Sequence, residues 1–366
     1  MRRLFWQPAP KMDPNSPQPK PFIIPVFLPH TGCPHRCVFC DQSAITGQTI
    51  PLPQPDQIRR DINTFLTYSK GRHATVQISF YGGNFLGLPE TTVHRLLDLA
   101  TGFISAGDVD SIRFSTRPDT INPQRLAWLK GYRVATIEIG AQSMDDRVLQ
   151  KSNRGHRAED TEKAMALLKA EGYETGLQMM LGLPGDTAAG ALETGRRIQA
   201  LAPDFVRIYP AVVLAGSALA DLMAAGDYTP LSLDVAIDIS AQLYKLFVSS
   251  HIRVIRMGLQ SSADLNRDNT FLAGPYHPAF GHLVMAKLFL DSACRELRRQ
   301  GQTENAISIA VNPRSVSHVK GQKNNNLATL QKLFAVDNIS VAVRPDLAET
   351  EVVVNMDEPV SILNGD

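Results

Sequence analysis

Three of the chain's four cysteines, Cys33, Cys37 and Cys40, stand within one short stretch, HTGCPHRCVFCDQ. A structural zinc site normally closes with four protein ligands, whereas three thiolates suit a 4Fe–4S cluster that keeps one iron without a protein ligand. The fourth cysteine, Cys294, lies far along the chain in a helical pattern, and we predict that it is an ordinary helix residue. The spacing therefore favours an iron–sulfur site, while zinc completed by a histidine such as His35 is the alternative.

The elements that must position these cysteines alternate regularly. Short apolar or β-branched runs predict strands at residues 22–28, 75–81, 111–116, 135–140, 174–181, 204–210 and 252–258. Amphipathic segments predict helices between them, at 56–70, 90–105, 158–172, 188–201 and 233–251. Such alternation indicates parallel strands joined by right-handed helical crossovers. So many successive units favour a partial or full TIM-like (β/α) barrel, with a doubly wound α/β sheet as the alternative.

Polar and glycine-rich segments follow most of the predicted strands. The cysteines follow the first strand, and GGNF, TRPD, GAQS, GLPGD and GLQ follow the second, third, fourth, fifth and seventh. The carboxyl ends of barrel strands form the rim at which such folds carry their active sites. The order of the motifs therefore predicts an enzyme whose site lies on that rim.

The predicted barrel domain spans residues 21–300, after an irregular, proline-rich lead-in over residues 1–20. The later pattern of strand, polar turn, helix and strand predicts a small C-terminal α/β module over residues 301–366. The lead-in lacks the apolar run of a signal peptide, and no stretch of about 18 apolar residues predicts a membrane span. The few cysteines favour a cytoplasmic protein, and a formal net charge of +1 indicates no membrane or nucleic-acid partner by itself.

The cysteine motif, with an aromatic residue before its last cysteine and the other motifs in this order, resembles the radical S-adenosylmethionine (SAM) superfamily. The resemblance implies that the three cysteines hold a 4Fe–4S cluster whose open iron binds SAM. An electron from a donor such as a flavodoxin or ferredoxin would then cleave SAM to a 5′-deoxyadenosyl radical, which abstracts hydrogen from a substrate. The superfamily fold is an α/β barrel of the predicted kind.

The same resemblance implies which residues contact SAM. The glycine pair after the second strand would meet its amino group, the segments after the third and fourth strands its carboxylate and ribose, and the turn after the fifth its adenine. These positions are Gly82, Gly83, Ser115, Arg117, Gln142, Gly182 and Leu183, with Phe39 against the adenine. Ordinary turns, a solvated arginine and a core aromatic residue are the alternatives. Asn84 stands where many members carry Glu, and we assign it no catalytic role.

The catalytic residues stay unassigned, with two pairs of candidates. Arg154 and His156 lie in the polar segment KSNRGHRAED, which either contacts the cofactor or substrate or forms a plain surface loop. Tyr276 and His277 lie in LAGPYHPAFGHL, which is either a substrate-side loop or a proline-bounded turn packed on the barrel.

Three longer stretches narrow the resemblance to one branch of the superfamily. Residues 115–149, 154–186 and 203–228 resemble the radical domain of the Elongator catalytic subunit and its bacterial relatives, and more weakly the oxygen-independent coproporphyrinogen oxidases. The resemblance covers about residues 20–290. The Elongator subunit also carries an acetyltransferase domain after its radical domain. The residues beyond position 300 are too few for one, so we expect none in this sequence.

The substrate class stays open between two hypotheses. The C-terminal stretch SVSHVKGQKNNNLATLQKLF resembles a KH module, which would favour an RNA or tRNA substrate, although Gly321 has no second glycine after it. A local basic patch supports this hypothesis; its residues are Arg314, Lys320, Lys323 and Lys332. Against it, residues 301–366 are acidic overall. The alternative is a small-molecule or peptide substrate, and a remote one is a non-enzymatic iron–sulfur or zinc RNA-binding scaffold.

Overall fold

The computed structural model describes residues 21–28, 32–40, 52–69, 75–259, 270–301, 305–355 and 357–364. The predicted lead-in over residues 1–20 and the histidine at position 30 lie outside these ranges. Among the helices within them, none is both long and apolar enough to cross a membrane.

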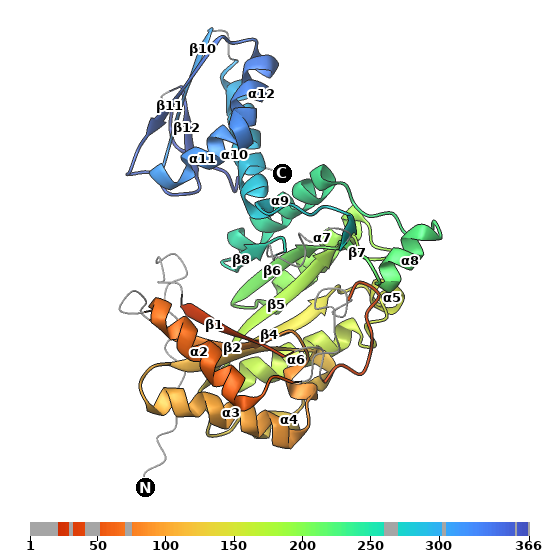
Figure 1. The fold of residues 1–366 in the computed structure, drawn as a ribbon. Helices are drawn as coiled ribbons and strands as arrows, with labels where there is room; N and C mark the ends of the chain where they lie inside the picture. The colour runs from red at the N-terminus through yellow and green to blue at the C-terminus, as the bar shows by residue number, and fades with distance from the viewer. Residues whose placement is uncertain are drawn as a thin grey trace.

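Seven parallel strands form one curled sheet (Figure 1). They are β1 (Phe22–Phe27), β2 (Val76–Tyr81), β3 (Ser111–Thr116), β4 (Val134–Gln142), β5 (Glu174–Leu181), β6 (Phe205–Pro210) and β8 (Arg253–Met257). Their spatial order, β1-β2-β3-β4-β5-β6-β8, follows the chain, and every neighbouring pair is parallel. In a doubly wound sheet the spatial order of the strands reverses at a switch point, and the order of these seven strands does not reverse. The predicted partial barrel is confirmed as a half-barrel.

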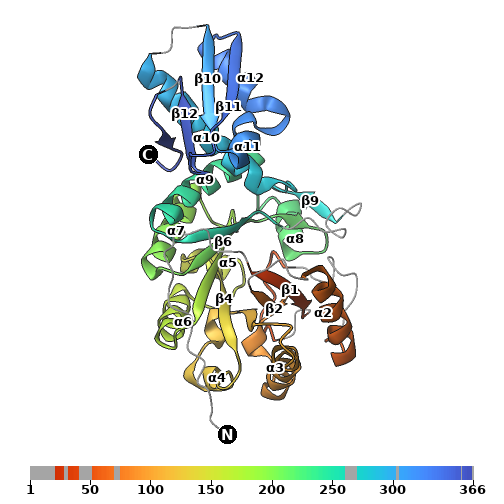
Figure 2. The same ribbon diagram turned by 90° about the vertical axis from the view of Figure 1, so that its left-hand side faces the viewer.

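Helices cover the outer face of the half-barrel, as the arc around the strands in Figure 2 shows. The long ones are α2 (Pro55–Ser69), α3 (Glu90–Ser105), α6 (Ala158–Ala170), α7 (Ala188–Leu201) and α9 (Leu233–Ser249), close to the predicted helices. Three short helices add to the loops at the strand ends: α4 (Pro123–Ala127), α5 (Asp146–Lys151) and α8 (Ala218–Ala224). A short antiparallel pair, β7 (Val213–Leu214) and β9 (Phe271–Ala273), was not predicted.

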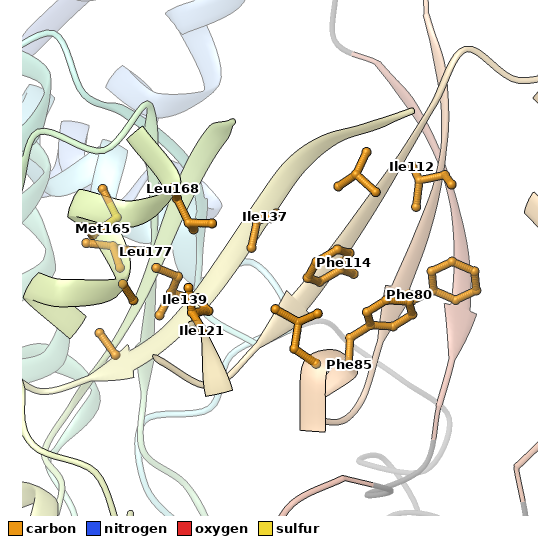
Figure 3. Close-up of a cluster of buried hydrophobic side chains, with 14 of the residues drawn as sticks. Phe80, Phe85, Ile112, Phe114, Ile121, Ile137, Ile139, Met165, Leu168 and Leu177 are labelled. Atoms are coloured by element: carbon orange, nitrogen blue, oxygen red, sulfur yellow. The ribbon is translucent and has the colours of Figure 1, made fainter. Parts of the chain in front are cut away.

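Alternate strand residues form the core between sheet and helices (Figure 3). Phe80 stacks on Phe85 at 5.1 Å between ring centroids, and Phe85 stacks on Phe114 at 4.4 Å. Isoleucines of β3 and β4, among them Ile112 and Ile137, complete this layer and are fully buried. Burying each such side chain contributes roughly 1.5–3 kcal/mol. Because side chains alternate along a strand, the residues between them point to the opposite side, here termed the inner face.

The C-terminal module is a mixed four-stranded sheet packed on a long helix, α10 (Phe280–Gln300). Its strands are β10 (Ala306–Val311), β11 (Asn338–Val343), β12 (Glu351–Val354) and β13 (Val360–Ser361), with α11 (Val316–Lys320) and α12 (Asn325–Phe334) between β10 and β11. One hydrophobic cluster contains residues of α9, α10 and the module. Helix α10 therefore connects the half-barrel to the module, and the division at residue 300 stays a prediction. Gly321 lies between α11 and α12, and the KH-like character of the module stays a prediction.

Candidate functional site

The cysteine loop, residues 32–40, rests on the loop that follows α5. The backbone N–H of Val38 donates to the carbonyl of Ser152 at 3.1 Å, and Asn153 Nδ2 donates to the carbonyl of Arg36 at 2.7 Å. The segment KSNRGHRAED, predicted either to contact the cofactor or substrate or to be a surface loop, is thus a support for the cysteines.

Gly155 of the same loop lies flat against a ring of the cysteine loop. Its φ is +71°, and a Cβ built there would stand 2.2 Å from the His35 ring. Only glycine accepts both this backbone conformation and this approach. The sequence contained this signal, a glycine between Arg154 and His156, but the contact with His35 could not be foreseen from it.

Arg154 places a buried guanidinium beside the cysteines. Its Nη1 lies 3.2 Å from Cys37 Sγ and its Nη2 donates to the carbonyl of Gly140 at 2.7 Å. The residue is only 6% exposed, and its Nε has no hydrogen-bond partner among the described residues. Arg154 therefore fixes the position of Cys37 Sγ in the site.

A second buried arginine, Arg117, lies next to the first. It forms a two-pronged ion pair with Asp119, at 2.9 and 3.0 Å, and its Nη2 also donates to the backbone carbonyl of Arg154. Burial raises the pKa of the Cys33 thiol, and the charges of Arg117 and Arg154 oppose that shift. Arg117 Nη1 is buried without a partner in the part of the chain that the structure describes. The sequence predicted Arg117 but not Asp119, which holds it in place.

His156, two residues after Arg154, is also buried. Burial and the neighbouring cations Arg154 and Arg117 lower the pKa of His156 to about 3, so its ring is neutral near pH 7. Its Nε2 lies 3.2 Å from the carbonyl of Ala141, which can only accept, so Nε2 carries the proton. Its Nδ1 is then a buried acceptor that has no partner among the described residues.

Asn84 joins the cysteine loop to the end of β3. Its Nδ2 donates to the carbonyl of Gly32 at 2.8 Å, while its Oδ1 accepts from the hydroxyls of Thr116 and Thr120 and from the backbone N–H of Arg117. The side chain is fully buried. Asn84 therefore ties the cysteine loop to the loop after β3 through buried hydrogen bonds.

The predicted glycine pair follows β2 at the same rim. Gly82 has a φ of +91°, and a Cβ there would stand 3.1 Å from the carbonyl oxygen of Leu28. Glycine is therefore required for the turn itself, and Gly83 beside it is half-buried. Ser115 lies near the end of β3 on the inner face, also half-buried.

Gln142 ends β4 in a strained conformation. Its φ is +67°, uncommon for a residue with a side chain, at a register shift between Gly140 and Gln142. The strand bulge directs the amide of Gln142 toward β5, where its Oε1 accepts from Gln178 Nε2 at 3.2 Å. Strained residues of this kind cluster at binding sites.

The turn after β5 encloses the aromatic residue of the cysteine motif. Phe39 packs against a cluster that includes Leu183 and Met180. The carbonyl of Gly182 accepts from Tyr228 Oη at 2.7 Å. The structure therefore brings the predicted residues Phe39, Gly182 and Leu183 close to one another.

Tyr276 and His277 lie elsewhere, in the connection between β9 and α10. Tyr276 packs against Phe271, with ring centroids 5.5 Å apart. His277 accepts from the backbone N–H of Ala279 at 3.0 Å and lies 3.5 Å from the side-chain amide of Gln322 in the C-terminal module. This pair lies where the half-barrel meets the module.

The residues around the cysteines fit a bound cluster with an anionic ligand. Among the described residues, no three His, Cys, Asp or Glu side chains stand in an arrangement that could hold a metal ion. The donor set nevertheless has three thiols free of disulfides. Beside it lie two buried arginines with unpartnered nitrogen atoms, Arg117 Nη1 and Arg154 Nε. Buried unpartnered donors are rare and suggest a missing acceptor.

Comparison with known families defines the class of protein. The radical SAM superfamily matches residues 27–198, and the radical SAM C-terminal domain matches residues 203–289. These ranges take in the cysteine loop, the supporting loop after α5 and strands β2 to β8. The protein is an enzyme of the radical SAM class, and the chain belongs to the radical S-adenosylmethionine superfamily.

Within this class, several relatives show the narrower resemblance. An uncharacterized protein of Methanocaldococcus jannaschii is 29% identical over 225 residues, covering 58% of this chain and 67% of the relative. A tRNA uridine(34) acetyltransferase of Dehalococcoides mccartyi is 24% identical, covering 64% and 58%. Elongator complex protein 3 of Danio rerio is 25% identical, covering 81% and 61%. The chain thus spans 58% to 67% of the length of these relatives. The predicted resemblance to the Elongator branch is confirmed.

A solved structure supports the fold. The archaeal Methanocaldococcus infernus Elp3 with an N-terminal deletion superposes with a TM-score of 0.56 at 19% identity, covering 77% of this chain and 63% of that chain.

Proposed function

We propose that Cys33, Cys37 and Cys40 hold a 4Fe–4S cluster and that the enzyme cleaves SAM reductively to abstract hydrogen from a nucleic-acid substrate, tRNA. The observation that carries the first part is the pair of buried guanidiniums against the cysteine loop, one of them 3.2 Å from Cys37 Sγ. A 4Fe–4S cluster bound by three thiolates supplies one electron and one open iron for the amino and carboxylate groups of SAM.

The chain's own residues then divide into supports and contacts. Arg154 orients Cys37, while Arg117 offers its unpartnered Nη1 to an incoming carboxylate. Asp119 prevents Arg117 from turning away, because it accepts two of its hydrogen bonds. His156 is neutral and can only accept through Nδ1, so its place in the site is that of a hydrogen-bond acceptor, for a ribose hydroxyl or a water.

The remaining proposed contacts with SAM come from residues at the carboxyl ends of the strands. The turn at Gly82 and Gly83 would present its backbone to the amino group, and Gln142 presents an amide that the β4 bulge holds in place. Phe39, Gly182 and Leu183 form an apolar wall suited to adenine. Tyr276 and His277, at the junction with the module, belong to the substrate side.

Two observations support a tRNA substrate. Relatives that cover most of this chain are named tRNA uridine(34) acetyltransferase or Elongator complex protein 3. In addition, the Gly321 loop carries two exposed lysines, Lys320 and Lys323, and lies beside the barrel junction through the contact between Gln322 and His277. A basic loop there can hold a phosphodiester backbone while the strand reaches the half-barrel.

An anaerobic assay tests both parts. The chain is reconstituted with iron and sulfide, reduced with dithionite or a flavodoxin, supplied with SAM, and assayed for 5′-deoxyadenosine with and without bulk tRNA. The proposal expects cleavage in both and faster cleavage with tRNA. Lys320→Gln with Lys323→Gln should remove the stimulation but keep the basal rate, whereas Lys130→Gln, an exposed lysine of the half-barrel, should keep both. If tRNA leaves the rate of SAM cleavage unchanged, the tRNA assignment is refuted and the substrate is a small molecule or peptide. The absence of cleavage would refute the SAM chemistry.

A further inference from the structure

Arginines of β3, β6 and β8 lie on the inner face of the half-barrel. Arg113 lies on β3 between the core residues Ile112 and Phe114, so its side chain points away from the helices. Arg207 lies on β6 between the core residues Val206 and Ile208, and its register partner on β8 is Arg256. We call these three residues the inner-face arginines.

Among the described residues, one carboxylate, that of Glu138, forms ion pairs with the inner-face arginines. Glu138 Oε1 accepts from Arg113 Nε at 2.6 Å, and its Oε2 accepts from Arg207 Nε at 2.5 Å. Although burial raises the pKa of Glu138, the charges of Arg113 and Arg207 outweigh burial and lower it, so the carboxylate is ionised near pH 7. Burial raises the pKa of Tyr81, whose hydroxyl joins the network, and keeps it neutral. The group therefore carries an excess of positive charge.

Arg256 has no carboxylate partner in the part of the chain that the structure describes. Its Nε donates to the carbonyl of Gly258 at 3.3 Å, and no carboxylate among the described residues lies within ion-pair distance of it. Its register partner is another arginine, Arg207, and like charges on neighbouring strands destabilise a sheet. An anion between the two would convert this repulsion into two attractions.

Arg113 supplies an independent indication of a ligand. The residue is 5% exposed, and its Nη2 is buried without a hydrogen-bond partner in the described part of the chain. Its guanidinium lies 4.6 Å from the Phe205 ring centroid, and this stacking fixes its plane. A buried, oriented donor that lacks an acceptor is rarely left so.

The inner-face arginines lie on the same face of the sheet as a proposed SAM contact. Arg207 and Arg256 are half-buried, unlike Glu138, so a ligand can approach them from the inner face. Glu138 is the register partner of Ser115, one of the proposed SAM contacts. Arg207 Nη1 also lies 3.2 Å from Tyr209 Oη, a further polar group on this face.

We propose that the inner-face arginines bind an anionic group of the reacting molecule, a carboxylate or a phosphate, between Arg207 and Arg256. The inference rests on the proposed function only in taking the inner face as the substrate side. A planar guanidinium pairs with either anion through two parallel hydrogen bonds, so the two sources share one chemistry.

Anion binding by the reconstituted full chain tests this without SAM or reductant. Melting temperature is followed against inorganic phosphate and, separately, succinate, with chloride keeping the ionic strength constant. At least one of the two should give a saturable rise. Arg256→Gln should weaken the apparent affinity about ten- to a hundredfold, as expected for the loss of a charge-assisted hydrogen-bond pair. Arg256→Lys should recover part of it, which guards against a mere folding defect.

The matched control is Arg253→Gln, which removes the same charge from the same strand, where Glu174 already pairs with it at 2.6 Å. It should bind as the wild type does. A rise with phosphate alone identifies a phosphorylated substrate, and a rise with succinate alone a carboxylate. No saturable rise with either anion, or equal affinity in wild type and Arg256→Gln, would overturn the inference. Because no SAM is present, a failure of SAM cleavage would overturn the proposed function alone.

Discussion

The hydrogen bond between Asn84 and the carbonyl of Gly32 holds the cysteine loop, and a substitution at Gly87 tests its contribution to stability. A Cβ on Gly87 would stand 2.2 Å from both the carbonyl oxygen of Gly32 and Asn84 Nδ2, the two atoms of a 2.8 Å hydrogen bond. Ordinary contact needs about 3.5 Å, so Gly87→Ala must move these groups by roughly 1.3 Å. Overpacking of this kind costs about 1–3 kcal/mol, and loss of the buried hydrogen bond adds about 1–3 kcal/mol. Gly87→Ala should therefore lower the free energy of unfolding by about 2–6 kcal/mol.

Chemical denaturation measures this loss, and iron content after reconstitution reports on the cysteine loop. Gly102→Ala is the control, because Gly102 is helical and a Cβ there meets nothing within 4 Å. That variant should be more stable than wild type, by about 0.5–1 kcal/mol. The double variant Asn84→Ala with Gly87→Ala should lose less than the sum of the single losses, since one of the two obstructed groups is gone. Wild-type stability and iron content in Gly87→Ala would refute the account of this contact.

Three further predictions concern charges. Glu138→Gln leaves Arg113 and Arg207 buried without a carboxylate, so denaturation should show a loss of about 3–5 kcal/mol; a change under 1 kcal/mol would mean that water already solvates the pair. Burial raises the pKa of Asp186 to about 6. Between about pH 4 and 6 the folded chain therefore binds a proton at Asp186 that the unfolded chain does not bind. The contribution of this proton to the free energy of unfolding is lost as pH rises through 6. Asp186→Asn should remove this slope, and an unchanged slope would exclude Asp186 as its source. Because the pKa of His156 is about 3, NMR of its ring should show no titration between pH 5 and 8; a titration near 6.5 would contradict its burial beside Arg154.

Much of the half-barrel could be predicted from the sequence. All seven predicted strands of the main sheet are present within a residue or two, because alternating apolar residues and flanking polar motifs mark each strand locally. The pair β7 and β9 was missed, since each has three residues or fewer and joins segments far apart in the chain. The bulge at Gly140 and Gln142 was also missed, because a positive φ in a glutamine has no local sequence signature.

The site was predicted less completely than the fold. Residue types and spacing identified the cysteines and the rim motifs, and Arg154 was a candidate without a defined contact. Its approach to Cys37 joins residues 117 positions apart and depends on how β1 and β4 are placed in the sheet. The pairing of Arg113 and Arg207 through Glu138 likewise depends on strand register and curvature, which no local pattern specifies.

The most direct measurement is the iron and sulfide content of the anaerobically reconstituted chain, together with the electron paramagnetic resonance spectrum of the reduced protein before and after SAM. The account predicts a 4Fe–4S signal that SAM alters, lost in Ala variants of Cys33, Cys37 and Cys40 and kept in Cys294→Ala. Bound zinc in place of iron, a cluster that survives Cys37→Ala, or a spectrum that SAM leaves unchanged would contradict it.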